Sequence, residues 1–229
     1  MGIVRLQTSF GRIFSQRCFY LFVSLVALLA VAPFVTDTSE GRLVVSVTHA
    51  FVLVAAVAAV GRTAVPFVIA LLLVLPTLGF RVMVMLGMEE PDHGLQISSA
   101  FMLAFYIVTL IYLLRYVFSP DVMTDDKLFG AAAAYLMLGI AWALAYDIAQ
   151  RLDPAAFGIQ PGQAHRSFYD LLFMSVGYLT SNGPGEIALV GAKVRTLAIL
   201  EQLFGTLYIA ILVARLAGIY PARAKVGDN

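Results

Sequence analysis

SFYDLLFMSVGYLTSNGPGEI, from Ser167 to Ile187, is the stretch that decides the fold. Its first half is an apolar run of about a dozen residues, which is too short to cross a bilayer as a helix. Gly183, Pro184 and Gly185 follow, and a Gly-Pro-Gly sequence breaks a helix. The pattern predicts a re-entrant half-helix followed by irregular backbone. Such backbone is tolerated at membrane depth only where protein or a water-filled cavity surrounds it, so the loop is expected to line a pore or vestibule.

The composition of the whole chain predicts that lipid is its main solvent. Of the 229 residues, 61% are hydrophobic and 13% are charged, and no soluble core is large enough to bury that much apolar sequence. The net charge of +1 supplies no basic field for nucleic acid, so no nucleic-acid partner is expected. There is no Gly-rich phosphate-binding loop, and no organic cofactor is expected. Cys18 is the only cysteine, which excludes an intrachain disulfide and a multi-cysteine metal site.

Six apolar stretches are predicted to be membrane-spanning helices, because a span needs roughly 20 apolar residues. They are Cys18 to Val35, Leu43 to Val60, Ala64 to Val84, Leu95 to Val117, Leu128 to Ile148 and Val194 to Ile219. The connectors between them carry turn or helix-breaking residues and leave no room for a soluble domain. The basic start and the AVA sequence at 30–32 imitate a cleaved signal peptide. Further spans follow, so the first stretch is predicted to remain as a transmembrane helix.

The placement of Lys and Arg predicts that both termini are cytoplasmic, because cationic loops are retained on that side of a membrane. The residues that then face the cytoplasm are Arg5, Arg12, Arg17, Arg62, Arg115, Lys127, Arg215, Arg223 and Lys225. The acidic loop MEEPD faces outward. Lys193 and Arg195 also fall on the outer side and weaken the bias around the last span. The chain is therefore predicted to be a multi-pass protein of the cell membrane, in a bacterial inner membrane.

Two sequences resemble parts of a known family. They are the loop TSNGPGE, from Thr180 to Glu186, and the apolar segment RTLAILEQLFGTLYIAILVARLAG that follows it. Together with the preceding span they resemble the pore domain of the potassium-channel superfamily, in particular its compact bacterial members with six helices. The resemblance covers roughly Leu128 to Tyr220, which is less than half of the chain. It implies a homotetrameric P-loop cation channel, in which four copies surround one conduit.

The resemblance implies roles for individual residues once the register of the filter is chosen. The segment 175–178, Ser-Val-Gly-Tyr, copies three letters of the family's T-V-G-Y-G-D signature. That register lengthens the connection to the inner helix and leaves no acid directly after the glycines. Counting backward from the inner helix instead assigns the filter to Thr180, Ser181, Asn182, Gly183, Pro184, Gly185 and Glu186. The same register places Asp170 at the start of the pore helix and Gly205 on the gating hinge of the inner helix.

Departures from the family's filter predict weak ion selectivity. The family's valine is Asn182 in this chain, and its tyrosine is Pro184. Pro184 supplies neither the aromatic packing nor the backbone N–H that holds stacked carbonyl rings in place. We expect a wider or shorter filter, in which Asn182 amides and a ring of Glu186 carboxylates contact partly hydrated cations. The expected permeant ions are Na+ and K+, with Ca2+ as a further candidate. A K+-selective channel with a variant filter is the alternative.

The resemblance also implies a plan of domains. Residues 1–118 are a four-helix peripheral domain like a voltage sensor, 119–127 a cytoplasmic linker, 128–220 the pore domain and 221–229 a short cytoplasmic tail. Voltage sensing needs several charges in the field, whereas the fourth span carries only Arg115 at its inner end. Little voltage dependence is therefore expected. The expected partners are other copies of the chain and membrane lipids, and the sequence identifies no accessory protein.

Four residues of the last span are singled out by their positions. Thr206, Ile209 and Val213 are spaced i, i+3 and i+7, so they share one helix face. The resemblance implies that this face lines the inner cavity, with Ile209 and Val213 as a hydrophobic constriction. Ordinary helix packing is the alternative. Glu201 is expected to face protein or water, because an ionised carboxylate that faced lipid would be costly, and its role is structural or in gating.

Two other functions compete with conduction. Tyr146-Asp147 and Gly183-Pro184-Gly185-Glu186 imitate the Y-D and G-x-G-D motifs of intramembrane aspartyl proteases. The second acid is a glutamate and lies in a loop, so no catalytic residue is assigned and the chain is predicted not to be an enzyme. A pore-shaped scaffold or sensor that does not conduct is the other alternative, because a filter without its tyrosine could collapse.

Overall fold

A computed structural model describes most of the chain, and its regular structure is helical. The described residues are 17–31, 51–57, 64–86, 91–158, 165–183, 185 and 187–219. The elements are α2 (Arg17–Val31), α4 (Ala64–Met85), α5 (Pro91–Val117), α6 (Asp125–Leu152), the 3-10 helix η2 (Pro154–Ala156), α7 (Phe168–Leu179) and α8 (Ala192–Ile219). Residues 51–57 are also helical. Within the described ranges, the extended backbone pairs in one antiparallel bridge, between Phe157 and Leu189.

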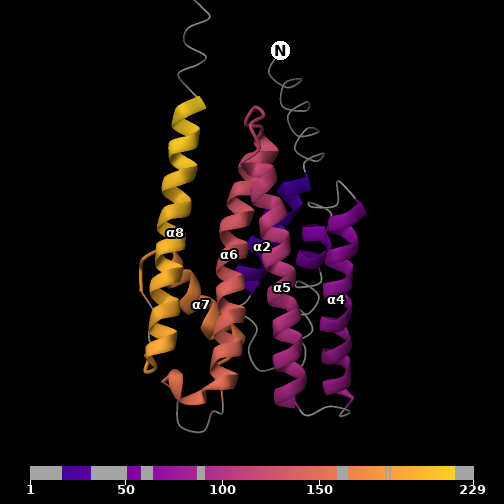
Figure 1. Cartoon of the computed structure of the whole chain (residues 1–229), viewed down its shortest axis with the longest axis vertical. Helices are drawn as coiled ribbons and strands as arrows, with labels where there is room; N and C mark the ends of the chain where they lie inside the picture. Colours follow the sequence, from indigo (N-terminus) through magenta and orange to yellow (C-terminus); the bar gives the residue numbers. More distant parts are fainter. Residues whose placement is uncertain are drawn as a thin grey trace, which may run out of the picture.

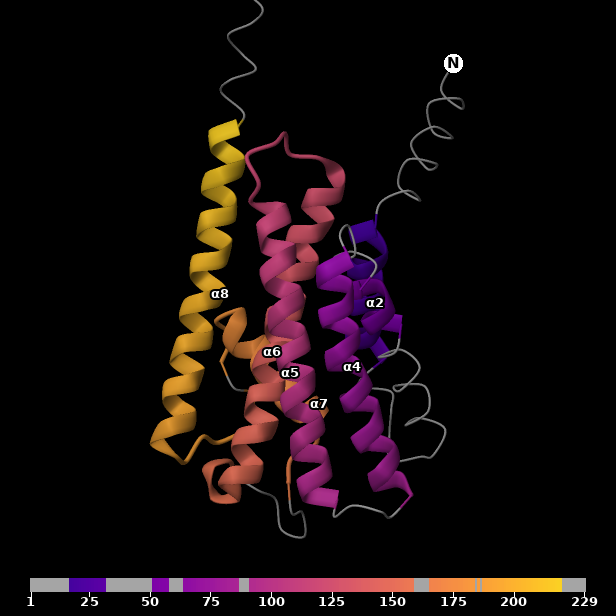
Figure 2. The same cartoon turned by 45° about the vertical axis from the view of Figure 1, so that its right-hand side comes forward.

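The long helices lie side by side in one bundle (Figure 1 and Figure 2). α5 packs against α4 and α6, and α2 packs on α6. α8 stands at the edge of the bundle, and the short helix α7 contacts both α6 and α8. The start of α2, the turn between α5 and α6, and the C-terminal end of α8 lie at the same end of the bundle. This end is called the turn end below.

Three of the described helices are long and apolar enough to cross a membrane. They are His93–Val117 within α5, Asp125–Leu152 and Ala192–Gly218 within α8. Shorter apolar helical stretches are Arg17–Val31 in α2, Val68–Phe80 within α4 and Phe168–Leu179 in α7. The structure therefore confirms an all-α fold with candidate membrane spans, while six spans and the division into a peripheral and a pore domain stay predictions. The second predicted span lies outside the described residues except at 51–57.

The core of the bundle is built around α6. Within the most apolar 18 residues of α6, 56% is buried inside the chain, whereas the corresponding share is 39% for α5 and 17% for α8. Small residues on α6, such as Gly130, Ala134 and Gly139, let neighbouring helices approach closely. Large side chains from the other helices then fill the remaining space, among them Tyr106 and Leu113 of α5. α8 is the least covered of the three candidate spans, so most of its surface is available to lipid, water or another copy.

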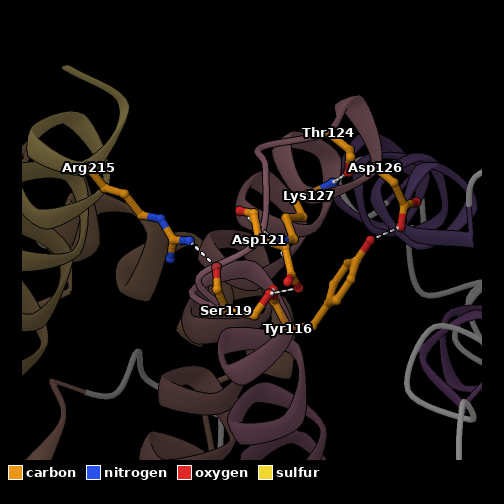
Figure 3. A network of polar contacts seen from close by, with 7 residues as sticks. All are labelled: Tyr116, Ser119, Asp121, Thr124, Asp126, Lys127 and Arg215. Carbon is orange, nitrogen blue, oxygen red and sulfur yellow. Dashed lines mark hydrogen bonds and ion pairs between the residues drawn. The ribbon is translucent and has the colours of Figure 1, made fainter. Parts of the chain in front are cut away.

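Polar contacts at the turn end tie three helices together (Figure 3). Asp126, in the first turn of α6, accepts hydrogen bonds from the Cys18 backbone N–H at 3.0 Å and from the Tyr116 hydroxyl at 2.7 Å. Thr124 caps the start of α6, because its hydroxyl oxygen accepts from the Lys127 N–H at 3.4 Å. Lys127 is buried, and its ammonium lies 3.8 Å from a carboxylate oxygen of Asp121. The starts of α2 and α6 and the end of α5 are therefore held in one place.

A second polar cluster lies near the opposite end of α6, around the carboxylate of Asp147, which is 5% exposed. Asp147 accepts hydrogen bonds from the Ser99 hydroxyl at 2.8 Å and from the Gln150 amide at 3.0 Å. The Arg151 guanidinium completes the cluster, with its Nε 3.1 Å from Asp147 Oδ2. A buried carboxylate is stable only when it is paired and hydrogen-bonded, and Asp147 meets both conditions.

Replacing Asp147 with alanine is expected to lower the free energy of unfolding by about 3 kcal/mol, because the buried Ser99 and Gln150 and the half-buried Arg151 would lose the carboxylate that they contact. The measurement is reversible unfolding of the purified protein in detergent, followed by circular dichroism. Asp125→Ala removes an exposed acid from the first turn of the same helix and is the matched control, which should change the free energy little. Equal losses for both variants would contradict a stabilising role for the Asp147 cluster.

Candidate functional site

The short helix α7 begins with a reciprocal pair of side-chain contacts. The Ser167 hydroxyl oxygen accepts from the Asp170 N–H, and the Asp170 carboxylate accepts from the Ser167 N–H, each at 3.2 Å. This capping box satisfies two backbone donors that have no partner inside the helix. The acidic charge also lies near the positive end of the helix dipole. The structure therefore places Asp170 in the first turn of a 12-residue helix, in the role of a helix-capping residue.

The chain folds back over the last turn of α7 where the helix ends. The carbonyl oxygen of Gly177 accepts from the N–H groups of Asn182 at 2.8 Å and of Gly183 at 3.1 Å. Ser181 and Gly183 have φ angles of 61° and 94°, so the backbone enters the left-handed region that allows such a reversal. The Thr180 hydroxyl donates to the Val176 carbonyl at 2.7 Å and accepts from the Asn182 amide at 2.9 Å. The loop thus completes the hydrogen bonds of the end of the helix.

The predicted filter residues fall into two groups. In the described group, Thr180, Ser181, Asn182 and Gly185 are exposed on the single chain and Gly183 is half-buried. Pro184 and Glu186 lie outside the described residues. The competing segment 175–178 lies within α7, and Ser175 there is fully buried. That segment is helical, so the structure presents the polar residues after α7, and not the Ser-Val-Gly-Tyr sequence, on an exposed loop.

Two glycines allow close backbone contacts around this loop. A Cβ atom on Gly177 would overlap the carbonyl oxygen of Gly183, and one on Gly205 would overlap the carbonyl oxygen of Leu179. α8 runs without interruption through Gly205. In this conformation Gly205 is therefore a site of close packing between α8 and the end of α7, and its role as a hinge stays a prediction.

Glu201 joins three helices at the centre of the site. Its side chain is fully buried, with 0% exposed. The Tyr146 hydroxyl of α6 donates to Glu201 Oε2 at 2.7 Å, and the Ser175 hydroxyl of α7 contacts Oε1. The Ser175 oxygen also lies 2.7 Å from the Gly139 carbonyl of α6. Glu201 thus faces protein, and it holds α7 between α6 and α8. Sequence reasoning identified Glu201 but not its partners Tyr146 and Ser175, because a spacing within one helix does not show which residues of other helices it meets.

α8 has one packed face and, next to it, an exposed stripe with two polar and two apolar residues. Its packed face consists of Val194, Ala198, Glu201, Gly205 and Tyr208. Gln202, Thr206, Ile209 and Val213 share the neighbouring face and are all exposed; these four residues are called the α8 stripe below. The side chain of Gln202 has no hydrogen-bond partner within the described part of the chain. A polar amide at membrane depth needs water or another polar surface. Gln202 was not among the residues predicted from the sequence, although its spacing of i−4 from Thr206 indicated a shared helix face.

The described residues form an all-helical membrane-protein fold with three candidate membrane-spanning helices, and a short helix with its polar loop packs beside one of them. Comparisons of the chain with protein-family models, with curated proteins and with solved structures found no match. The function is therefore proposed from the arrangement of the site.

Replacing Gly205 with alanine is expected to lower the free energy of unfolding by about 2 kcal/mol, because the new methyl group would displace the Leu179 carbonyl and the end of α7. Gly218→Ala is the matched control on the same helix, since a Cβ there meets nothing within 4 Å. Gly218→Ala should leave stability unchanged or raise it slightly. Unfolding in detergent measures both, and a Gly205→Ala variant as stable as the parent would contradict the close contact.

Proposed function

We propose that the chain is one subunit of a homotetrameric membrane channel that conducts cations passively, with weak selectivity between Na+ and K+. The observation that carries this proposal is the exposed polar loop Thr180 to Asn182, which follows the half-length helix α7 where its last residue, Leu179, packs against Gly205 of α8. The proposal includes no covalent chemistry.

The length of α7 supports a loop at membrane depth. Its 12 residues extend about 18 Å at 1.5 Å per residue, whereas the hydrocarbon core of a bilayer is about 30 Å thick. α7 packs against α6 and α8, which are both long enough to cross that core. A helix of this length that starts near one surface ends inside the membrane. The backbone after it must then be surrounded by protein or water, and in the single chain Thr180 to Asn182 are uncovered.

The α8 stripe supports assembly around a shared conduit. Gln202 and Thr206 are exposed on a helix that is otherwise largely apolar. Lipid cannot satisfy an amide group, whereas water in a central pore can. Closed symmetry allows several copies to present the same stripe to one axis, and a tetramer is the assembly that the family resemblance implies. Ile209 and Val213 continue the stripe toward the turn end, where four copies of each would form a hydrophobic constriction that gates by dewetting.

The loop supplies the chemistry that a cation requires. The hydroxyl oxygens of Thr180 and Ser181, the amide oxygen of Asn182 and backbone carbonyl oxygens are neutral ligands for hard cations. The loop also follows the C-terminal end of α7, where the helix dipole is negative and favours positive charge. Glu186 would add a carboxylate at the outer mouth of each subunit. These groups favour cations over anions and do not define the rigid carbonyl cage that a K+-selective filter needs.

The protease alternative has little support in the arrangement of Asp147. Its carboxylate is engaged by Ser99, Gln150 and Arg151, so the fold already uses its acceptor capacity. An aspartyl protease needs two carboxyl groups that share a proton.

Liposomes that contain the purified protein are expected to release both Na+ and K+, and Gln202→Leu is expected to reduce that flux at least severalfold. The variant removes the amide of the stripe and leaves Thr206 as its one polar side chain, whose hydroxyl already donates to the backbone carbonyl of residue 202, so water and ions would be held less well on this face of α8. Thr196→Val is the matched control, because Thr196 is exposed on the same helix but lies outside the stripe. Absence of flux from the parent under every gating condition would favour the non-conducting scaffold.

Pro184→Tyr is expected to move the reversal potential under Na+/K+ bi-ionic conditions from near zero toward the K+ equilibrium potential. The tyrosine restores the aromatic ring and the backbone N–H that stabilise a narrow carbonyl filter. Val190→Tyr adds the same ring at an exposed position after the loop and should leave the potential unchanged. A parent that is already K+-selective would support the variant K+ channel and exclude the weakly selective one.

A further inference from the structure

A cavity of about 500 Å³ lies between α5, α6 and α8. Its lining residues are Leu110, Leu114 and Phe118 at the end of α5, Ala134 and Leu138 on α6, and Phe204, Leu207, Tyr208 and Ile211 on α8. The hydroxyl of Tyr208 is already paired, because it donates to the Ala131 carbonyl at 2.7 Å. The cavity is therefore apolar, and its volume falls within the range of about 300–1,000 Å³ that is usual for ligand sites.

A cation lies at the turn end of this cavity. Arg215 follows Ile211 by one helical turn on α8, and its guanidinium carbon lies 5.2 Å from the centre of the Phe118 ring. The Arg215 Nη2 group donates to the Ser119 carbonyl oxygen (Figure 3). Within the described residues Arg215 has no carboxylate partner, in contrast to the nearby Lys127, which pairs with Asp121. A guanidinium has five N–H donors, so most of the hydrogen-bonding capacity of Arg215 is available to an anion.

The cavity and the α8 stripe lie on opposite sides of α8. At 3.6 residues per turn, successive residues are separated by 100°, which places Phe204, Leu207 and Ile211 roughly half a turn away from Gln202 and Thr206. Copies that present their stripes to a common axis therefore do not place those stripes in the cavity. In a membrane, the molecules that reach an apolar space with a cation at its end are amphiphiles with an anionic head.

We propose that the cavity and Arg215 form a binding site for an anionic glycerophospholipid. An acyl chain lies between α5, α6 and α8, and the headgroup phosphate binds the Arg215 guanidinium at the turn end. Arginine suits this role because its planar group donates two parallel hydrogen bonds to phosphate oxygens. The site requires that the chain lies in a membrane but does not depend on conduction, so loss of lipid binding and loss of ion flux are separate outcomes.

Tryptophan fluorescence provides the test, because Trp142 is the only tryptophan and its ring centre lies 6.2 Å from that of Phe204 in the cavity wall. The full-length protein is placed in phosphatidylcholine vesicles that contain a small fraction of brominated phosphatidylglycerol or of brominated phosphatidylcholine. Bromine on an acyl chain in the cavity would quench Trp142. The anionic lipid is expected to quench at a roughly fivefold lower fraction than the neutral one, as expected for one arginine near an anionic headgroup.

Arg215→Gln should abolish the preference for the anionic lipid, whereas Arg115→Gln should keep it. Arg115 is an exposed arginine near the same end of α5 and is the matched control for general surface charge. Ala134→Leu fills part of the cavity and should weaken quenching by the anionic lipid. Native mass spectrometry of the same variants counts bound phosphatidylglycerol directly, and fewer copies on Arg215→Gln than on Arg115→Gln are expected.

Three results would overturn the site. Equal quenching by both lipids in the parent would show that Arg215 selects no headgroup, as expected if another copy of the chain filled the cavity. Retention of the preference by Arg215→Gln would place the anion elsewhere. If Arg115→Gln lost the preference for the anionic lipid to the same extent, general surface charge would explain that preference, and the site would be excluded. Gel filtration and circular dichroism identify a variant that has not folded, and the mass-spectrometric count on the remaining variants then decides.

Discussion

The hydrogen bonds around the buried Glu201 carboxylate are the interaction on which the position of the site depends. Tyr146 of α6 and Ser175 of α7 both contact this one group on α8. A carboxylate without partners would be costly in a buried setting, so α7 cannot slide along α8 without losing stabilisation. Because Ser175 lies one turn before the end of α7, this contact also determines where the following loop emerges. The polar residues Thr180 to Asn182 are therefore positioned by a group that lies behind them.

Close packing at two glycines also fixes the position of the loop. Gly205 lies one turn after Glu201 and brings the backbone of α8 against the Leu179 carbonyl, while Gly177 accommodates the Gly183 carbonyl. Each contact requires the absence of a side chain, so the two glycines set the distance between α8, the end of α7 and the loop. The hydrogen bonds of Glu201 orient the helices, and the glycines set how closely they approach. The loop consequently has little freedom near α7 and α8, although it is exposed on its other side.

The sequence predicted the elements better than their contacts. The predicted spans Leu128 to Ile148 and Val194 to Ile219 lie within α6 and α8, because apolar length is a local property that hydropathy measures directly. The short helix α7 could be predicted equally well, since Ser167 can cap its start and glycines follow its end. The partners of Glu201 were not, because periodicity shows which residues share a face but not how α8 is rotated against α6 and α7. The cavity could not be predicted from the sequence either, because an unfilled space depends on how side chains from three helices meet.

The two halves of α8 are held in different ways, and this difference bears on how the proposed channel would open. Toward its N-terminus, α8 packs through Val194, Ala198, Glu201 and Gly205, which are all buried. Toward its C-terminus, the hydrogen bonds of Tyr208 to Ala131 and of Arg215 to Ser119 cross to α6 and to the end of α5, with the apolar cavity between them. A helix supported by few contacts has the lower cost of displacement, so movement is expected beyond Gly205, where Ile209 and Val213 of the proposed constriction also lie. An acyl chain in the cavity would restore packing on that half of α8 alone. Lipid occupancy would then act on the proposed gate while leaving the loop beside α7 in place.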